Sequence, residues 1–297
     1  MKCLRAATLT VADLDRSEAL YRDWLDYETV EKGQLEAALA ASWGAPGSAG
    51  KRYAVMQPRS GARIYIRFVE DTPHPDYEPL KTYGWAAIEI CVEDVLAVNA
   101  RMEKSPFTII GPPREIEGLP AIYPMQVQGP DGEIVYLTQI RDDMPAYDLP
   151  RATSLVDRMF IHVLACSDMR ATMAFAEQQL GYGYGREMDI VYTMLANAFG
   201  MPYERLFTIA TGVHERDVFL EYDQLPPQGT PRPCHKGRLV PGIAISTLIL
   251  PDFATRIRKL APWCITDPAP RQGPVYAGRM AATLRGPDGT LFEVVEP

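Results

Sequence analysis

The amino-acid sequence predicts an α+β fold in which four βαβββ modules form two eight-stranded half-barrels. The main observation is an internal repeat, because residues 11–27 (VADLDRSEALYRDWLDY) align without a gap on residues 166–182 (CSDMRATMAFAEQQLGY). A GPDG turn followed by an alternating strand also occurs twice, at residues 128–140 and 285–297. The copies of these motifs lie 155 (166 − 11) and 157 (285 − 128) residues apart, a spacing that indicates a duplicated domain.

Each half begins with an alternating apolar strand, LRAATLTV or FIHVLAC, and a helix follows it. Asp13 and Asp168 hold the third place of the two repeats, where a carboxylate is a natural N-cap. A second strand and helix recur at residues 84–95 and 242–253. Every half therefore contains the strand and helix arrangement twice, which gives four modules.

A short helix stopped by Gly-x-Pro is expected in each half, at residues 34–46 and 191–202. Trp43 and Phe199 stand at the same place in these helices. Two roles fit them equally well. They could cover the mouths of the half-barrels and favour a flat, apolar ligand, or they could simply pack in the core.

The polar stretch 142–157 separates the two halves. We therefore expect an N-terminal domain at residues 1–141, a linker at 142–157 and a C-terminal domain at 158–297.

Composition restricts the function and the surroundings. The formal net charge of −8, with scattered Lys and Arg, argues against nucleic acid as a partner. No apolar run is long enough for a signal peptide or a membrane span. The five cysteines lie far apart without a CxxC pair, which favours a reduced, cytoplasmic setting. A small molecule is the expected partner, and self-association as a homodimer is plausible.

With its modules in this order, the chain resembles the vicinal oxygen chelate superfamily, which contains glyoxalases, bleomycin-resistance proteins and extradiol dioxygenases. The motifs that carry the resemblance are VADLDRS…LYRDWLDY, CSDMRAT…FAEQQLGY and the two GPDG endings, and it covers nearly the whole chain. The resemblance implies that two modules form a cup with metal ligands on its inner wall. One His, Gln or Glu comes from the first strand of a module and one Glu from the last. Divalent Fe, Mn, Zn or Ni suits such a set of ligands.

Carried over residue by residue, these positions depart from the family pattern in both halves. Both last-strand glutamates of the second half are present, but isoleucine replaces both histidines. We therefore expect no metal cofactor. The positions are Ala6, Arg67, Ala87 and Tyr136 in the first half, and Ile161, Glu221, Ile245 and Glu293 in the second.

His162 is one residue away from a ligand position. On a regular strand that slip turns its side chain to the opposite face, towards the module helix. A bulge in the strand could instead aim His162 inward, and a metal site of His162, Glu221 and Glu293 would result.

In the first half, strand alternation points Arg67, Glu89 and Tyr136 to the side of the lost ligands. One interpretation is an internal polar network with Arg67 paired to Glu89 and Tyr136 bonded nearby, because a buried charge must be paired. The other is a substrate clamp, in which Arg67 binds an acidic or carbonyl group and Tyr136 donates a hydrogen bond.

Three functions compete on these grounds. The first is a lyase or isomerase that acts on a small carbonyl or aromatic compound, with Glu293 and Glu221 as an acid/base pair whose pKa is raised by burial and repulsion. Arg67 or Arg279 would hold an anionic group of the substrate. The second is a metal-dependent enzyme, dioxygenase-like or glyoxalase-like, that uses the displaced His162. The third is a non-catalytic protein that binds a drug or another small molecule. We favour the first, because the histidines that the second requires are missing.

Overall fold

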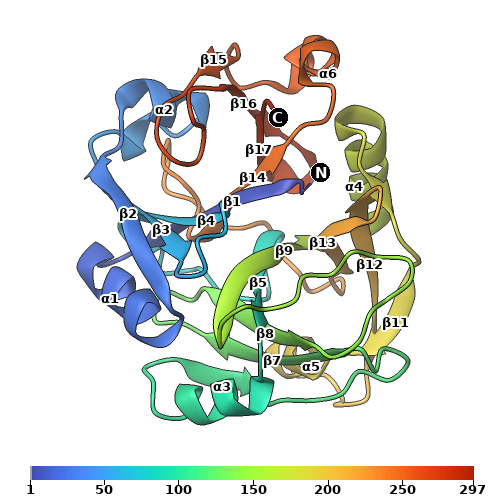
Figure 1. Cartoon of the computed structure of the whole chain (residues 1–297). Coiled ribbons are helices and arrows are strands. Elements are labelled where there is room, and N and C mark those ends of the chain that lie inside the picture. Colours follow the sequence, from blue (N-terminus) through green and yellow to red (C-terminus); the bar gives the residue numbers. More distant parts are fainter. Residues whose placement is uncertain (1) are drawn as a thin grey trace.

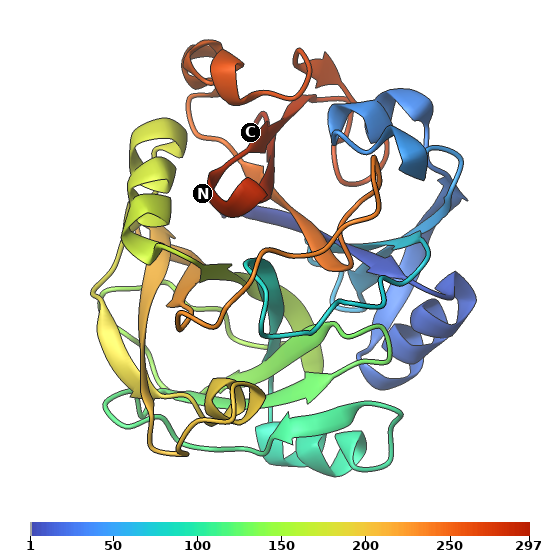
Figure 2. The same cartoon turned by 180° about the vertical axis from the view of Figure 1, so that it is seen from behind.

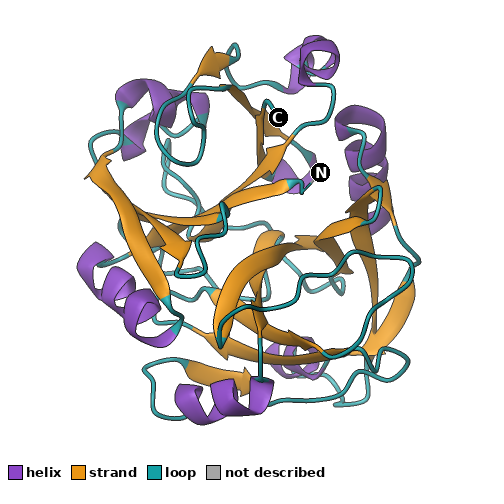
Figure 3. Cartoon of the chain, in the orientation of Figure 1, coloured by secondary structure: helices purple, strands orange, loops and turns teal. Residues whose placement is uncertain are grey.

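Two curled sheets form the body of the molecule, and helices lie around their outer sides (Figure 3). The computed structural model describes residues 2–297. The first sheet, in the upper half of Figure 1, contains the blue and the red parts of the chain, which include its two ends. The second sheet, in the lower half, contains the green and yellow middle of the chain. The predicted α+β class and the two half-barrels are confirmed.

Within the described residues, the first sheet has eight strands in the order β15-β16-β17-β14-β1-β4-β3-β2. These strands are β1 (Leu4–Val11), β2 (Tyr27–Gln34), β3 (Arg52–Pro58), β4 (Tyr65–Glu70), β14 (Gly242–Ile249), β15 (Ala269–Pro270), β16 (Met280–Arg285) and β17 (Leu291–Val295).

The second sheet has nine strands over residues 2–297, in the order β10-β12-β13-β9-β5-β8-β7-β6, and β11 pairs with β12. These strands are β5 (Gly84–Val92), β6 (Thr108–Gly111), β7 (Ile122–Gln128), β8 (Ile134–Ile140), β9 (Val156–Cys166), β10 (Gly183–Tyr184), β11 (Met188–Val191), β12 (Leu206–His214) and β13 (Asp217–Gln224).

The first helix of each half begins where the sequence predicts a cap. The Asp13 side chain accepts a hydrogen bond from Arg16 N, and that of Asp168 accepts one from Ala171 N. The two short helices end at Trp43 and Phe199, as expected. The α-helices are α1 (Leu14–Trp24), α2 (Ala37–Ser42), α3 (Val95–Met102), α4 (Met169–Phe175), α5 (Thr193–Ala198) and α6 (Phe253–Lys259).

The strand pairing crosses the two halves of the sequence, which differs from the expectation that each half forms its own cup. β1 pairs with β14 and β5 pairs with β9, both antiparallel. The first module is therefore completed by the fourth, and the second by the third (Figure 1; Figure 2). Every module offers the same open edge, that of its first strand, so the repeat itself does not specify which modules pair.

The main core lies between the helices and the sheets and continues between the two sheets. Trp85 on β5 is 1% exposed, and its Nε1 donates to the Leu291 carbonyl oxygen of β17 at 2.8 Å. This bond joins one sheet to the other. Over residues 2–297 no helix has both the length and the apolar character needed to cross a membrane.

Candidate functional site

The inner wall of the first sheet, here called the closed cup, holds a buried ion pair. A cavity of about 240 Å³ lies beside this pair and has Arg67 and Tyr276, but not Glu293, in its lining. Arg67 on β4 and Glu293 on β17 approach to 3.3 Å between Nη2 and Oε2, and each side chain is 2% exposed. The guanidinium also donates to Thr8 Oγ1, from Nε at 3.0 Å and Nη2 at 2.8 Å, and to the Tyr276 hydroxyl at 2.7 Å.

The Glu293 carboxylate has donors on both of its oxygens. Oε1 accepts from Trp43 Nε1 at 2.7 Å and from the Tyr276 hydroxyl at 2.8 Å. Oε2 accepts from Thr247 Oγ1 at 2.7 Å and from Arg67. The Arg67 guanidinium carbon lies 4.4 Å from the Trp43 ring centroid, a cation–π contact. The charges are thus paired and the buried polar atoms are satisfied within the protein.

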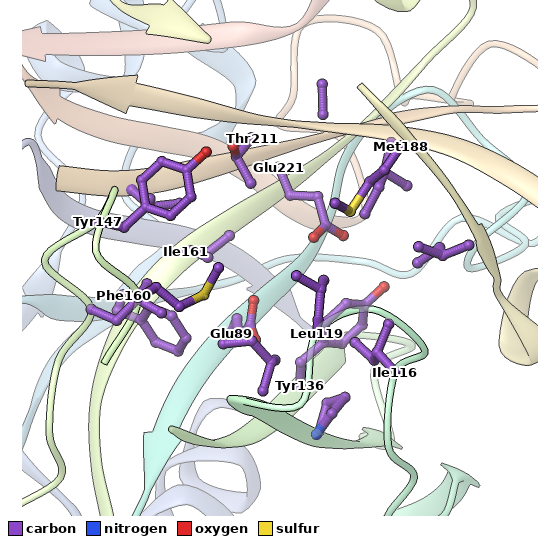
Figure 4. A pocket seen from close by; sticks show the side chains of 18 of the residues that line it. Glu89, Ile116, Leu119, Tyr136, Tyr147, Phe160, Ile161, Met188, Thr211 and Glu221 are labelled. Atoms are coloured by element: carbon purple, nitrogen blue, oxygen red, sulfur yellow. The ribbon is translucent and has the colours of Figure 1, made fainter. Parts of the chain in front are cut away.

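The inner wall of the second sheet, here called the open cup, contains a cavity of about 150 Å³. Glu89 on β5 and Glu221 on β13 point their carboxylates into this space from two sides (Figure 4). The rest of the lining is mainly apolar. It includes Ile116, Leu119, Ile122, Phe160, Ile161, Met188, Ile190, Ile209 and Val218.

Neighbouring strands position the polar groups of the open cup. Glu89 pairs with Tyr136 of β8 on one side and with Ile161 of β9 on the other. The β5–β9 register then skips from Ile161 to Met159, which leaves Phe160 in a bulge. Both Phe160 and Ile161 consequently line the cavity.

Two segments outside the sheet close the open cup. The loop between β6 and β7 contributes Ile116 and Leu119. The stretch predicted as a linker contributes Met144, Tyr147 and Leu149. The connection between the two halves of the sequence is therefore also a wall of the cavity.

Hydroxyl groups hold both carboxylates in place. Thr138 Oγ1 donates to Glu89 Oε1 at 2.5 Å. The Tyr192 hydroxyl donates to Glu221 Oε1 at 3.2 Å and is itself bonded to the Tyr136 hydroxyl. The Tyr136–Tyr192 and Tyr192–Glu221 bonds form a chain that leads from β8 to β13.

The carboxyl groups of the open cup are held partly in their protonated form. Burial and the nearby Glu221 raise the pKa of Glu89 to about 8. Burial, together with the charge of Asp223 and a hydrogen bond to it, raises the pKa of Glu221 well above its usual range. Burial also raises the pKa of Asp223. Several carboxyls in an apolar space cannot all ionise, so they share protons near neutral pH.

A raised pKa does not by itself mark this place as the site. Burial and Asp131 also raise the pKa of Glu133 to about 8. Glu133 follows the first GPDG turn, where its Oε2 accepts from Asp131 N at 3.0 Å, and it does not line the cavity of the open cup. The combination of a cavity with perturbed carboxyls distinguishes the open cup.

Comparison with solved structures identifies the fold. Glyoxalase I from Zea mays superposes with a TM-score of 0.67 at 17% identity, covering 100% of this chain and 92% of that chain. A putative dioxygenase from Bacillus subtilis gives a TM-score of 0.64 at 14% identity, covering 99% and 86%. The chain has the vicinal oxygen chelate fold. No family model matches the sequence, and a comparison with curated proteins finds no significant match.

The ligand positions that the vicinal oxygen chelate fold provides do not carry a fitting donor set. Because the modules pair across the halves, the open cup places Ala87, Tyr136, Ile161 and Glu221 at these positions. The closed cup places Ala6, Arg67, Ile245 and Glu293 there. At these four positions each cup has one carboxylate and no imidazole, and the closed cup has a guanidinium. Over residues 2–297 no group of three His, Cys, Asp or Glu side chains is arranged to hold a metal ion.

His162 faces away from the open cup, and the alternative metal set of His162, Glu221 and Glu293 is not brought together. Its Nδ1 is bonded to Ser246 Oγ of the first sheet at 2.6 Å, and its ring lies 5.5 Å from that of Trp85. The bulge in β9 falls at Phe160 and leaves His162 on the outer face. Burial lowers the pKa of His162 to about 3.

The structure regroups the other predicted site residues. Glu89, Tyr136 and Glu221 meet in the open cup, whereas Arg67, Trp43 and Glu293 meet in the closed cup. The predicted Glu293–Glu221 and Arg67–Glu89 pairs are not formed, because their members belong to different sheets.

Two further predicted residues lie outside both cups. Phe199 is half-buried beside the apolar cluster that surrounds the open cup, and it does not line the cavity. Arg279 donates to the Glu296 carbonyl oxygen at 3.2 Å instead of to Glu293.

Asp223, Tyr192 and Arg186 are among the polar residues of the open cup that the sequence did not predict. Asp223 follows Glu221 by two places in VFLEYD, so strand alternation alone would have put it on the same face. Tyr192 immediately precedes α5, and the exposed Arg186 lines the cavity from the loop before β11. Nothing in the local sequence of these last two residues marks them.

Proposed function

We propose that the open cup is the site of a proton-transfer enzyme, of the lyase or isomerase type, that acts on a small carbonyl or aromatic compound. The observation that carries this proposal is the pair of carboxyls, of the buried Glu89 and the half-buried Glu221, directed into an apolar cavity. General acid/base catalysis requires a group whose pKa lies near the operating pH. Burial raises the pKa of Glu89 to about 8, which meets that requirement.

The two carboxyls suit opposite roles in moving one proton. One of them, ionised, accepts a proton from a carbon next to the substrate carbonyl. The other, protonated, returns a proton to a different atom of the substrate, which produces isomerisation or elimination. Thr138 and the Tyr136–Tyr192 pair act as positioning residues, because their hydroxyls fix the orientation of the Glu89 and Glu221 carboxyls.

The size and lining of the cavity restrict the substrate. A space of about 150 Å³ with apolar walls holds a molecule about the size of benzene. Arg186 lines the same cavity, is exposed, and forms no ion pair within the described residues. An aromatic or short aliphatic carbonyl compound fits the cavity, and an acidic substituent would lie next to Arg186.

The apolar lining also supports a second function, ligand binding without turnover. Both functions are tested with acetophenone in deuterated buffer, where NMR follows the exchange of its methyl protons. The enzyme hypothesis predicts exchange that falls by about 100-fold or more in Glu89→Gln and Glu221→Gln. Glu133→Gln is the matched control, because it neutralises a buried carboxyl with an equally raised pKa outside the cavity. Binding of acetophenone without exchange would favour the second function, and exchange unaffected by either cavity variant would contradict the first.

A further inference from the structure

A second cavity, of about 380 Å³, lies where the two sheets meet and is lined by an excess of positive charge. It is formed by the start of β1, the turn between β3 and β4, and the starts of β9 and β13. Lys2, Arg5, Arg63 and Arg158 line it, and Asp217 is its one acidic lining residue within the described part of the chain.

The single carboxylate does not balance these cations. Asp217 is already engaged, since Lys2 Nζ lies 2.7 Å from Oδ1 and Cys3 N donates to Oδ2 at 2.8 Å. Arg5, Arg63 and Arg158 form no ion pair anywhere in residues 2–297. The chain as a whole has 38 acidic and 30 basic residues, so a local group of unpaired arginines runs against its overall charge.

Arg5 is the least satisfied member of the group. Its Nη1 makes a long hydrogen bond of 3.4 Å to the Arg63 carbonyl oxygen, and its buried Nε has no partner within residues 2–297. Burial lowers the pKa of Arg5, as do the charges of Arg279 and Arg63, although Tyr65 opposes them. A buried donor without a partner is costly, and an anion in the cavity would remove that cost.

The remaining walls of this cavity are apolar. Leu4, Ile64, Pro150 and Phe219 line it, together with Phe160, whose other contacts are with the open cup. A bare inorganic ion would leave these surfaces unused. A ligand with a ring or short chain would cover them while its charged end met the arginines.

We propose that this cavity binds a small organic anion, whose phosphate or carboxylate group is held by Arg5, Arg63 and Arg158. The planar guanidinium fork matches both groups, and it donates two parallel hydrogen bonds to either. The site is separate from the carboxyls of the open cup and does not depend on the function proposed for them.

The test measures binding of phenyl phosphate, benzoate and inorganic phosphate to the full-length protein by calorimetry at low salt. We expect phenyl phosphate or benzoate to bind more tightly than inorganic phosphate, and the preferred one identifies the anionic group. Affinity should fall as salt is added. Arg5→Gln and Arg158→Gln should each weaken binding by about tenfold or more.

Arg59→Gln is the matched control, because Arg59 is an exposed arginine of the same β3–β4 turn that is paired with Asp26 and Glu28. Its affinity should equal that of the wild type. Circular dichroism verifies that each variant is folded, and Arg5→Lys, which keeps the charge, should retain part of the affinity if Arg5→Gln unfolds. Binding that is unchanged in Arg5→Gln and Arg158→Gln, or no binding of any of the three anions at millimolar concentration, would overturn the proposal.

Discussion

Replacing Arg67 with methionine should destabilise the protein strongly, because the closed cup is held by a buried network that depends on this side chain. Met has a similar length and is apolar, so the substitution removes the charge and the donors with little change in volume. It removes the bonds to Thr8, Tyr276 and Glu293 together. The Glu293 carboxylate then remains buried with donors from Trp43, Tyr276 and Thr247 but without a countercharge.

The expected loss is about 3–5 kcal/mol in the free energy of unfolding, which is the usual cost of removing one partner of a buried ion pair. Adding Glu293→Gln removes the unpaired charge. The double variant should therefore lose less stability than the sum of the two single losses, and the difference, the coupling energy, should be about 1 kcal/mol or more.

Urea unfolding followed by circular dichroism and tryptophan fluorescence measures these differences. Arg59→Met is the control, since it removes an exposed arginine whose ion pairs should contribute less than about 1 kcal/mol. If Arg67→Met costs no more than the control, or if the two substitutions are additive, then the closed cup is not held together by this network.

Three further predictions follow from the buried titratable groups and the donor set. Glu89, whose pKa is raised to about 8 in the folded state, keeps a proton that the unfolded chain releases near pH 4.3. The free energy of unfolding should therefore fall as pH rises from about 5 to 8, by roughly 1.4 kcal/mol per pKa unit and by a few kcal/mol in all. The urea midpoint should depend less on pH over this range in Glu89→Gln than in the wild type, and an unaltered pH dependence would contradict the raised pKa of Glu89. The pKa of His162 is lowered to about 3, so its imidazole NMR signals should show no titration between pH 7 and 4.5, whereas a midpoint near 6.5 would place it in solvent. Neither cup has a fitting donor set, so Mn²⁺, Zn²⁺ or Ni²⁺ should raise the melting temperature no more than Mg²⁺ does, and a rise specific to one metal would refute this.

The sequence was sufficient for the modules and for the direction of most side chains. The caps at Asp13 and Asp168 and the GPDG turns are local signals that need no knowledge of the rest of the chain. Strand alternation also placed the inward-facing side chains correctly, since Glu221 lines the open cup and Glu293 lies on the inner wall of the first sheet. His162 was likewise expected to face away from the cup, and it does, but it is bonded to Ser246 of the first sheet and packs on Trp85 instead of on the module helix.

The sequence was not sufficient for the partners of these side chains. Each module has an equivalent open edge, so the repeat allows the second module to pair with the first or with the third. Pairing with the third module puts Glu89 in one cup with Glu221 and leaves Arg67 in the other. It therefore also separates the predicted acid/base pair, with Glu221 in the open cup and Glu293 in the closed cup. Trp43 was expected either to cover a cup or to pack in the core. It is fully buried in the closed cup, where its Nε1 donates a hydrogen bond to Glu293.

The open cup should accept a ligand between its carboxyls, whereas the directly paired Arg67 and Glu293 of the closed cup should admit none between them. Diffraction from crystals soaked in 4-bromoacetophenone tests this directly, because the anomalous signal of bromine locates the compound. The account predicts a bromine position in the cavity between Glu89, Tyr136 and Glu221. A bromine position between Arg67 and Glu293, with the open cup empty, would contradict it.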